Sequence, residues 1–170
     1  MITKEQVRLL AEYNQWMNEK VYDGAAQLND EARKKDLQAN YKSIHSTLNY
    51  LLWADYVWLG RFTANTPLAK DYPQGPIGVD HYADWSDLVA ARRDMDRDFL
   101  KWSEEVSEEW LAGDYSWHSV LTNKTITKPA WFLVTHLFNH QTDHRGQVIT
   151  LLKQQGISIG DSDLLFMPTN

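Results

Sequence analysis

The chain contains no cysteine in its 170 residues. This absence excludes disulfides, thiolate metal ligands and a cysteine nucleophile supplied by the protein itself. It also fits a protein of the reducing cytoplasm, which is the location we expect. The sequence has neither a signal-peptide core at its N-terminus nor a run of 18 apolar residues. We therefore expect no secretion and no membrane span.

Basic residues are in the minority. The 17 lysines and arginines stand against 23 aspartates and glutamates, which gives a formal net charge of −6 and a pI of about 5.4. Proteins that bind nucleic acids normally present a Lys/Arg stripe that displaces counterions from the phosphates. We therefore expect no nucleic-acid partner.

Several catalytic signatures are missing as well. The sequence has no G-x-S-x-G nucleophile motif, no glycine-rich phosphate loop, no H-E-x-x-H motif and no aspartate-rich calcium loop. The acidic run at 104–109 lacks the paired Glu-x-x-His pattern of di-iron bundles, so a solvated helix face is expected there. Histidine placement is then the main chemical signal.

Four long amphipathic helices are predicted within one domain that spans residues 1–170. Apolar residues recur at spacings of three, four or seven in four stretches, at about 3–28, 41–63, 84–110 and 127–156. Thr3 and Gln6 have the spacing of a capping box, and Asn40 is the predicted N-cap of the second helix. The eight tryptophans and eight tyrosines predict a core that contains amphipathic aromatic side chains.

The connections between these stretches predict the topology. Residues 64–83 hold three prolines and two glycines, which indicates a long irregular crossover, and residues 113–127 indicate a short β-hairpin or loop that turns near Asn123. A bundle with a long crossover has neighbours that are not sequential. The predicted fold class is therefore all-α, a four-helix bundle with a crossed connection.

Two histidines fall on the apolar stripe of the fourth helix. At 100° per residue, an arc of roughly 80° contains Leu133, Leu137, His140, His144, Val148 and Leu151. Residues at i and i+4 are neighbours one turn apart, so two imidazoles on one helix can reach a common ion. Spacing alone leaves two interpretations open, a metal site and a structural polar cluster.

The stretch LFNHQTDHRGQV at 137–148 closely resembles the signature of the DinB family, within the DinB/YfiT-like superfamily. The resemblance extends to YNQWMN at 13–18, to SIHSTLNYLLWAD at 43–55, and to Gly156 with the later Asp-Leu-Leu at 163–165. It implies a four-helix bundle that is commonly a homodimer. It also implies a divalent metal held by three histidines, one on the second helix and the pair His140 and His144. Characterised relatives include thiol S-transferases that act on low-molecular-weight thiols.

The sequence departs from the family pattern at Tyr50, where the resemblance places the third histidine. A neutral phenol with an ordinary pKa near 10 is a poorer metal ligand than imidazole at neutral pH. His45 does not replace the missing ligand, because it projects roughly 140° away from Tyr50 around the helix. We expect His45 at the surface or in a helix contact.

The remaining polar residues have supporting roles in this interpretation. Asp55 lies on the buried side of the second helix and is expected to accept a hydrogen bond from a neighbouring helix or to hold a histidine. Three histidines are expected to be exposed: His81, His118 and His136. A position at the surface, or one that supports a ligand histidine, is expected for Asn139, Gln141, Asp143, Arg145 and Gln147.

Two functions are compatible with these features. In the first, His140 and His144 hold a divalent ion, zinc or nickel, and water, alone or with Tyr50 as a weak third ligand, completes its shell. The ion activates a small-molecule thiol or water for transferase or hydrolase-like chemistry. In the second, the bundle is a metal-free protein, which binds small molecules or serves as a dimeric scaffold. Tyr50 then bonds to a helix-four histidine and fills the space of the ion.

Overall fold

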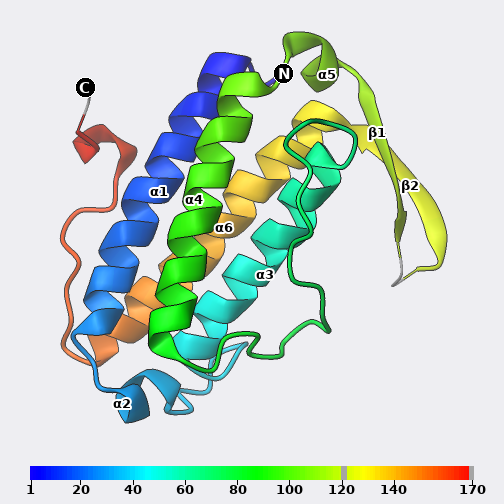
Figure 1. The fold of residues 1–170 in the computed structure, drawn as a ribbon. Helices are drawn as coiled ribbons and strands as arrows, with labels where there is room; N and C mark the ends of the chain where they lie inside the picture. The colour runs from blue at the N-terminus through cyan, green and yellow to red at the C-terminus, as the bar shows by residue number, and fades with distance from the viewer. Residues whose placement is uncertain (120–121, 169–170) are drawn as a thin grey trace.

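The computed structural model describes residues 1–119 and 122–168. Four long helices form the body of the molecule (Figure 1), namely α1 (Lys4–Ala26), α3 (Ile44–Thr63), α4 (Trp85–Glu105) and α6 (Ala130–Gln154). The shorter elements are α2 (Asp30–Lys34), α5 (Glu108–Ala112), β1 (Asp114–Ser119), β2 (Lys124–Pro129) and the 3-10 helix η1 (Leu164–Phe166). The all-α bundle with a short hairpin is confirmed.

The long helices do not simply pack in sequence order, because α1 and α3, the first two, are not packed against each other. α1 packs against α4 and α6, and α3 packs against the same two helices. In Figure 1, α1 and α3 lie on opposite sides of the α4–α6 pair, and the long connection after α3 runs back along the molecule before α4 begins. The crossed connection predicted from the sequence is therefore present.

The helix starts follow local side-chain chemistry. Thr3 and Gln6 form the predicted capping box. The predicted N-cap Asn40 is wrong, because Lys42 has a left-handed backbone (φ of 64°) that a helix cannot contain. Ser43 caps α3 instead, and its side-chain oxygen accepts a hydrogen bond of 3.0 Å from the backbone N–H of Ser46.

The predicted third helix is in fact two helices. α4 ends at Glu105, and Ser107 then caps α5 by accepting a hydrogen bond from the backbone N–H of Trp110. Val106 and Leu111 are buried on either side of this break. The periodicity of apolar residues carries across the break, which is why the sequence pattern reads as one helix.

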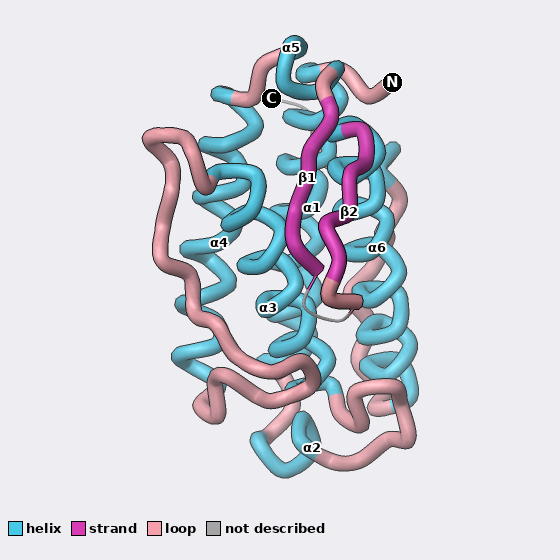
Figure 2. Tube along the Cα trace, turned by 90° about the vertical axis from the view of Figure 1, so that its right-hand side faces the viewer, coloured by secondary structure: helices cyan, strands magenta, loops and turns pink. Residues whose placement is uncertain are grey.

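The predicted hairpin is present and extends beyond the fourth-helix boundary. β1 and β2 pair antiparallel, with Trp117 opposite Ile126, and the hairpin runs alongside α3 and α6 (Figure 2). Strand β2 reaches Pro129, so α6 begins at Ala130, directly after the range 127–129 in which its start was predicted. Val120 and Leu121, which the predicted hairpin includes, lie outside the described residues.

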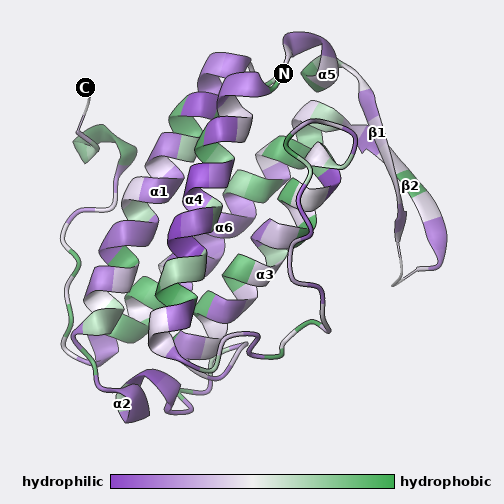
Figure 3. Ribbon diagram, viewed as in Figure 1, coloured by the Kyte–Doolittle hydropathy of each residue, from purple (hydrophilic) through white to green (hydrophobic). Residues whose placement is uncertain are grey.

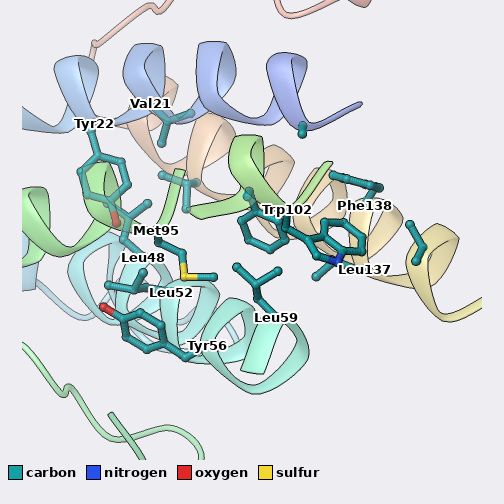
Figure 4. Packing of buried hydrophobic residues seen from close by; sticks show 14 of the residues in the cluster. Val21, Tyr22, Leu48, Leu52, Tyr56, Leu59, Met95, Trp102, Leu137 and Phe138 are labelled. Atoms are coloured by element: carbon teal, nitrogen blue, oxygen red, sulfur yellow. The ribbon is translucent and has the colours of Figure 1, made fainter. Parts of the chain in front are cut away.

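The core lies between the four long helices. Hydrophobic positions turn toward the middle of the bundle and hydrophilic positions toward solvent (Figure 3). The buried cluster mixes aliphatic and aromatic side chains, and Figure 4 shows Trp102 from α4 close to Leu137 and Phe138 from α6. Ring centroids of Phe62 and Trp102 lie 5.5 Å apart in a stacked arrangement. Aromatic residues thus fill part of the core, as their number predicted.

Within residues 1–119 and 122–168, no helix has both the length and the apolar character that a membrane span requires.

Candidate site around His140 and His144

The two histidines of the predicted pair lie side by side on α6. Their ring centroids are 4.5 Å apart at an interplanar angle of 64°. His144 is buried, with 8% of its surface exposed, and His140 is half-buried. Both rings turn toward α3, because α6 packs against that helix with the face that the i, i+4 spacing defines.

Tyr50 projects from α3 into the same place. Its hydroxyl and the Nε2 atom of His140 share a hydrogen bond of 3.1 Å. Its ring centroid lies 5.0 Å from that of His144. Burial, together with the neighbouring Tyr41 hydroxyl, raises the pKa of Tyr50 above its ordinary value, so the phenol keeps its proton at neutral pH.

Tyr41 stacks on Tyr50, a contact that the sequence did not predict. The two phenol rings stack with centroids 3.8 Å apart, and Tyr41 also meets the edge of His144 at 5.7 Å. Tyr41 comes from the turn before α3, whose direction is set by the left-handed Lys42. Helical spacing could not indicate this contact, because Tyr41 was predicted to be the first residue of the helix and instead lies in the turn before it.

His144 is held in a defined orientation by its own helix. The Nε2 atom of Gln147 donates to Asp143 over 3.0 Å, which turns the amide oxygen of Gln147 toward the Nδ1 atom of His144 at 3.3 Å. That oxygen only accepts, so Nδ1 of His144 donates to it, and Nε2 is the ring nitrogen that remains for a metal ion. Metal-ligating histidines are usually fixed in this way. Gln147 thus orients the ring of His144, and Asp143 is exposed, which is the surface position expected for it.

His140 is neutral over the physiological range. Burial and the adjacent His144 lower its pKa to about 4. Its Nδ1 atom is buried and has no hydrogen-bond partner among the described residues. His140 thus has a neutral ring whose Nε2 atom contacts Tyr50, whereas the orientation of His144 is fixed from the far side of the ring.

A buried ionic network lies directly behind the histidines and excludes the surface position, one of the two alternatives predicted for Gln141 and Arg145. Gln141 and Arg145 are almost fully buried, not at the surface, because α6 packs against α1 as well as α3 and its buried arc is wider than the histidine stripe. Gln141 donates to Asp55 over 2.7 Å, and Asp55 also pairs with Arg92 of α4. Asp55 therefore accepts hydrogen bonds from two neighbouring helices, one of the two roles expected for it.

The network continues across α1. Arg92 pairs with Asp96 at 2.9 Å, and Asp96 accepts a hydrogen bond of 2.8 Å from Asn18. Arg145 donates to Asn14, which interrupts the apolar stripe of α1. Buried charges are normally retained only when they are paired in this way. The network thus ties all four long helices together.

Of the other histidines, His136 lies next to the pair, with its ring centroid 5.8 Å from that of His140. His45 is fully buried and its Nε2 atom contacts the backbone oxygen of Tyr82 at 2.8 Å, so it is a helix-packing residue. His118 and His136 are exposed, as expected. The expected exposure of His81 is wrong, because its ring is half-buried next to Gly75 in the connection before α4.

The residues present do not fit a three-histidine metal site. Position 50 supplies a protonated phenol, and the described residues contain no group of three His, Asp or Glu side chains able to hold one ion. The donor set does fit a two-imidazole site, because both rings lie on one rigid helix and the contact of His144 with Gln147 uses Nδ1 rather than Nε2. A cavity of about 290 Å³ between α1 and α4 lies away from this cluster.

Comparisons with known proteins agree with the fold and the sequence motifs. The chain is 24% identical over 159 residues to the protein DinB of Bacillus subtilis (strain 168), a match that covers 91% of this chain and 88% of that protein. The crystal structure of a DinB-like protein from Bacillus cereus ATCC 10987 superposes with a TM-score of 0.58 at 15% identity, over 85% of this chain and 89% of that chain. The model of the DinB family matches residues 1–169. The chain therefore belongs to the DinB family.

Proposed function

We propose that this DinB-family protein binds a divalent ion, zinc or nickel, through His140 and His144, with lower affinity than a three-histidine site would have. The observation that carries the proposal is the orientation of His144, whose Nδ1 proton is held by Gln147. This contact occupies Nδ1 of His144 and leaves Nε2 as the ligand atom, on a ring whose centroid lies 4.5 Å from that of His140. His140, whose pKa is lowered to about 4, is then available as a neutral ligand beside His144 on the same helix.

Tyr50 lowers the affinity of this site in two ways. It replaces a strong imidazole ligand with a protonated phenol. It also competes with the ion for the Nε2 atom of His140, which it contacts at 3.1 Å. When bound, an ion with open positions lowers the pKa of a coordinated small-molecule thiol or water. The protein's own residues orient the rings and, through Tyr41 and Tyr50, shield one side of them from solvent.

Metal binding by protein purified without a chelating column tests the proposal. Equilibrium dialysis against zinc or nickel should give one saturable site per chain. His144→Ala should abolish it, whereas replacing the exposed His118 with alanine should leave it unchanged. Binding of less than about 0.1 equivalent by the wild type under saturating metal would contradict the proposal.

A second function is supported by the Tyr50–His140 hydrogen bond itself. In this alternative the bundle is metal-free, and the phenol satisfies the histidine in place of an ion. The protein would then bind small molecules or act as a dimeric scaffold. Metal dialysis separates the two functions directly, since the alternative requires that His144→Ala and the wild type bind equally little metal. Thermal unfolding in the presence of small thiols then becomes the informative measurement.

A further inference from the structure

Arg61 is held between two tryptophan rings. Its guanidinium lies 4.8 Å from the ring centroid of Trp58, on the same helix, and 5.6 Å from that of Trp117 on strand β1. The hydroxyl of Tyr115 donates to the backbone oxygen of Arg61 over 2.7 Å, which fixes the hairpin against the end of α3. The guanidinium is therefore held in place before any ligand arrives.

This arginine has no acidic partner. Among residues 1–119 and 122–168, no aspartate or glutamate lies within ion-pairing distance of Arg61. The side chain is half-buried, and burial lowers its pKa. A partly desolvated cation without a counter-charge is unfavourable, and its position in the last turn of α3 offsets only part of this cost. A bound anion would offset the remaining cost of the unpaired charge.

Arg61 lies on the same side of the molecule as the histidine cluster. The ring centroid of Trp58 lies 5.4 Å from that of His136, and the ring centroid of His136 lies 5.8 Å from that of His140. Tyr50 and Arg61 are eleven residues apart on α3, which corresponds to about 16 Å along the helix, and the guanidinium of Arg61 lies over the ring of Trp58. A small molecule of that length can reach from the histidines to the guanidinium across the side chains of α3 and α6.

We infer that Arg61 binds the carboxylate of a small-molecule ligand whose other end lies at His140 and His144. The planar fork of arginine matches a carboxylate with two parallel hydrogen bonds, and a guanidinium already ordered by stacking loses little freedom on binding. The inference rests on the proposed function, because it takes the histidine cluster as the other end of the ligand. It names the substrate class of that site as carboxylate-bearing small molecules, including thiols.

Calorimetry with a matched pair of probes tests this inference. Glutathione carries free carboxylates and a thiol, and its diethyl ester has the same thiol with both carboxylates masked. In buffer with a chelator, the wild type should bind glutathione about tenfold more tightly than the ester. Arg61→Met should remove this preference, and Arg61→Lys should retain part of it. Arg93→Met changes an exposed arginine of α4 and should have no effect.

The outcomes are distinct for the two proposals. A preference for glutathione that disappears in Arg61→Met supports the anion site, even if dialysis finds no metal. Three results would overturn the inference. The wild type could show no saturable binding of glutathione, it could bind the two probes equally, or Arg61→Met could keep the preference for glutathione. A purely structural Arg61 would change the unfolding midpoint of Arg61→Met and leave the ratio of the two probe affinities unchanged.

Discussion

Adjacent residues of α6 belong to two regions that are organised differently. Gln141 and Arg145 turn into the core and join a network in which polar groups from four helices bond to one another. His140 and His144, each one residue earlier, turn toward Tyr50, and Nδ1 of His140 lacks a partner among the described residues. The charges of the network are paired within the protein and lie away from solvent. The histidine cluster has no charge partner within the described part of the chain, and His140 is only half-buried, so a ligand from solvent can reach it.

The largest expected effect comes from breaking the network. Arg92→Met should lower the free energy of unfolding by about 3–5 kcal/mol, because it leaves Asp55 and Asp96 buried without their cation. Chemical denaturation measures this change. The exposed neighbour Arg93 supplies the control, and Arg93→Met should change stability by less than about 0.5 kcal/mol. Equal effects of the two substitutions would show that the network is not a structural unit.

Removing the support of His144 should have the next largest effect, and it should fall on binding. Gln147→Met cannot accept the Nδ1 proton and should weaken zinc or nickel binding about tenfold. The unfolding free energy should change little, because Gln147 is only partly buried. Gln154→Met, at the exposed end of α6, is the matched control. Unchanged metal affinity in Gln147→Met would remove the argument from ring orientation.

The pH dependence of stability should distinguish His140 from the network. A histidine with a lowered pKa binds fewer protons in the folded state than in the unfolded state, so its contribution is present above about pH 6.5 and is lost as the pH falls toward 4. With allowance for partial exposure, we expect a loss of about 1 kcal/mol across this window.

The comparison must be made against His140→Asn, because Asp96 titrates in the same window. Burial raises the pKa of Asp96 to about 6, so its own contribution changes with the opposite sign, and this change occurs in both proteins. The difference between wild type and variant, measured by denaturation at several pH values, isolates His140. If the free energies of unfolding of the wild type and His140→Asn changed in parallel with pH, His140 would have the same pKa in the folded and unfolded states.

The smallest effect is expected from loss of the hydrogen bond between Tyr50 of α3 and His140 of α6. Tyr50→Phe removes the bond to His140 but keeps the ring that stacks on Tyr41. We expect a change in unfolding free energy of about 1 kcal/mol or less, together with a modest gain in metal affinity because the competing hydroxyl is gone. A weaker metal site in Tyr50→Phe would instead identify the phenol as a ligand.

The sequence predicted the features that repeat along one helix and missed those that depend on distant partners. The bundle, the crossed connection and the shared face of His140 and His144 follow from 3.6-residue periodicity. The burial of Gln141 and Arg145 does not, since it depends on Asp55 of α3 and Asn14 of α1. Asn14 offered a signal, because a polar residue within an apolar stripe requires a buried partner.

The local errors have equally specific causes. The start of α3 was placed too early because the left-handed backbone of Lys42 has no signature in a lysine side chain. The stacking of Tyr41 on Tyr50 follows from that turn and was missed with it. Tyr50 itself was identified as a departure from the family pattern, and its contact with His140 could be anticipated but not measured.

X-ray absorption spectroscopy of the metal-loaded protein tests the central claim most directly, because it counts the imidazoles bound to the ion. The wild type is expected to show two imidazole ligands, with the remaining ligands oxygen, and Tyr50→His is expected to show three together with at least tenfold tighter binding. An identical spectrum for the two proteins, or a wild-type spectrum without imidazole ligands, would contradict the account of His140 and His144 as a two-imidazole site limited by Tyr50.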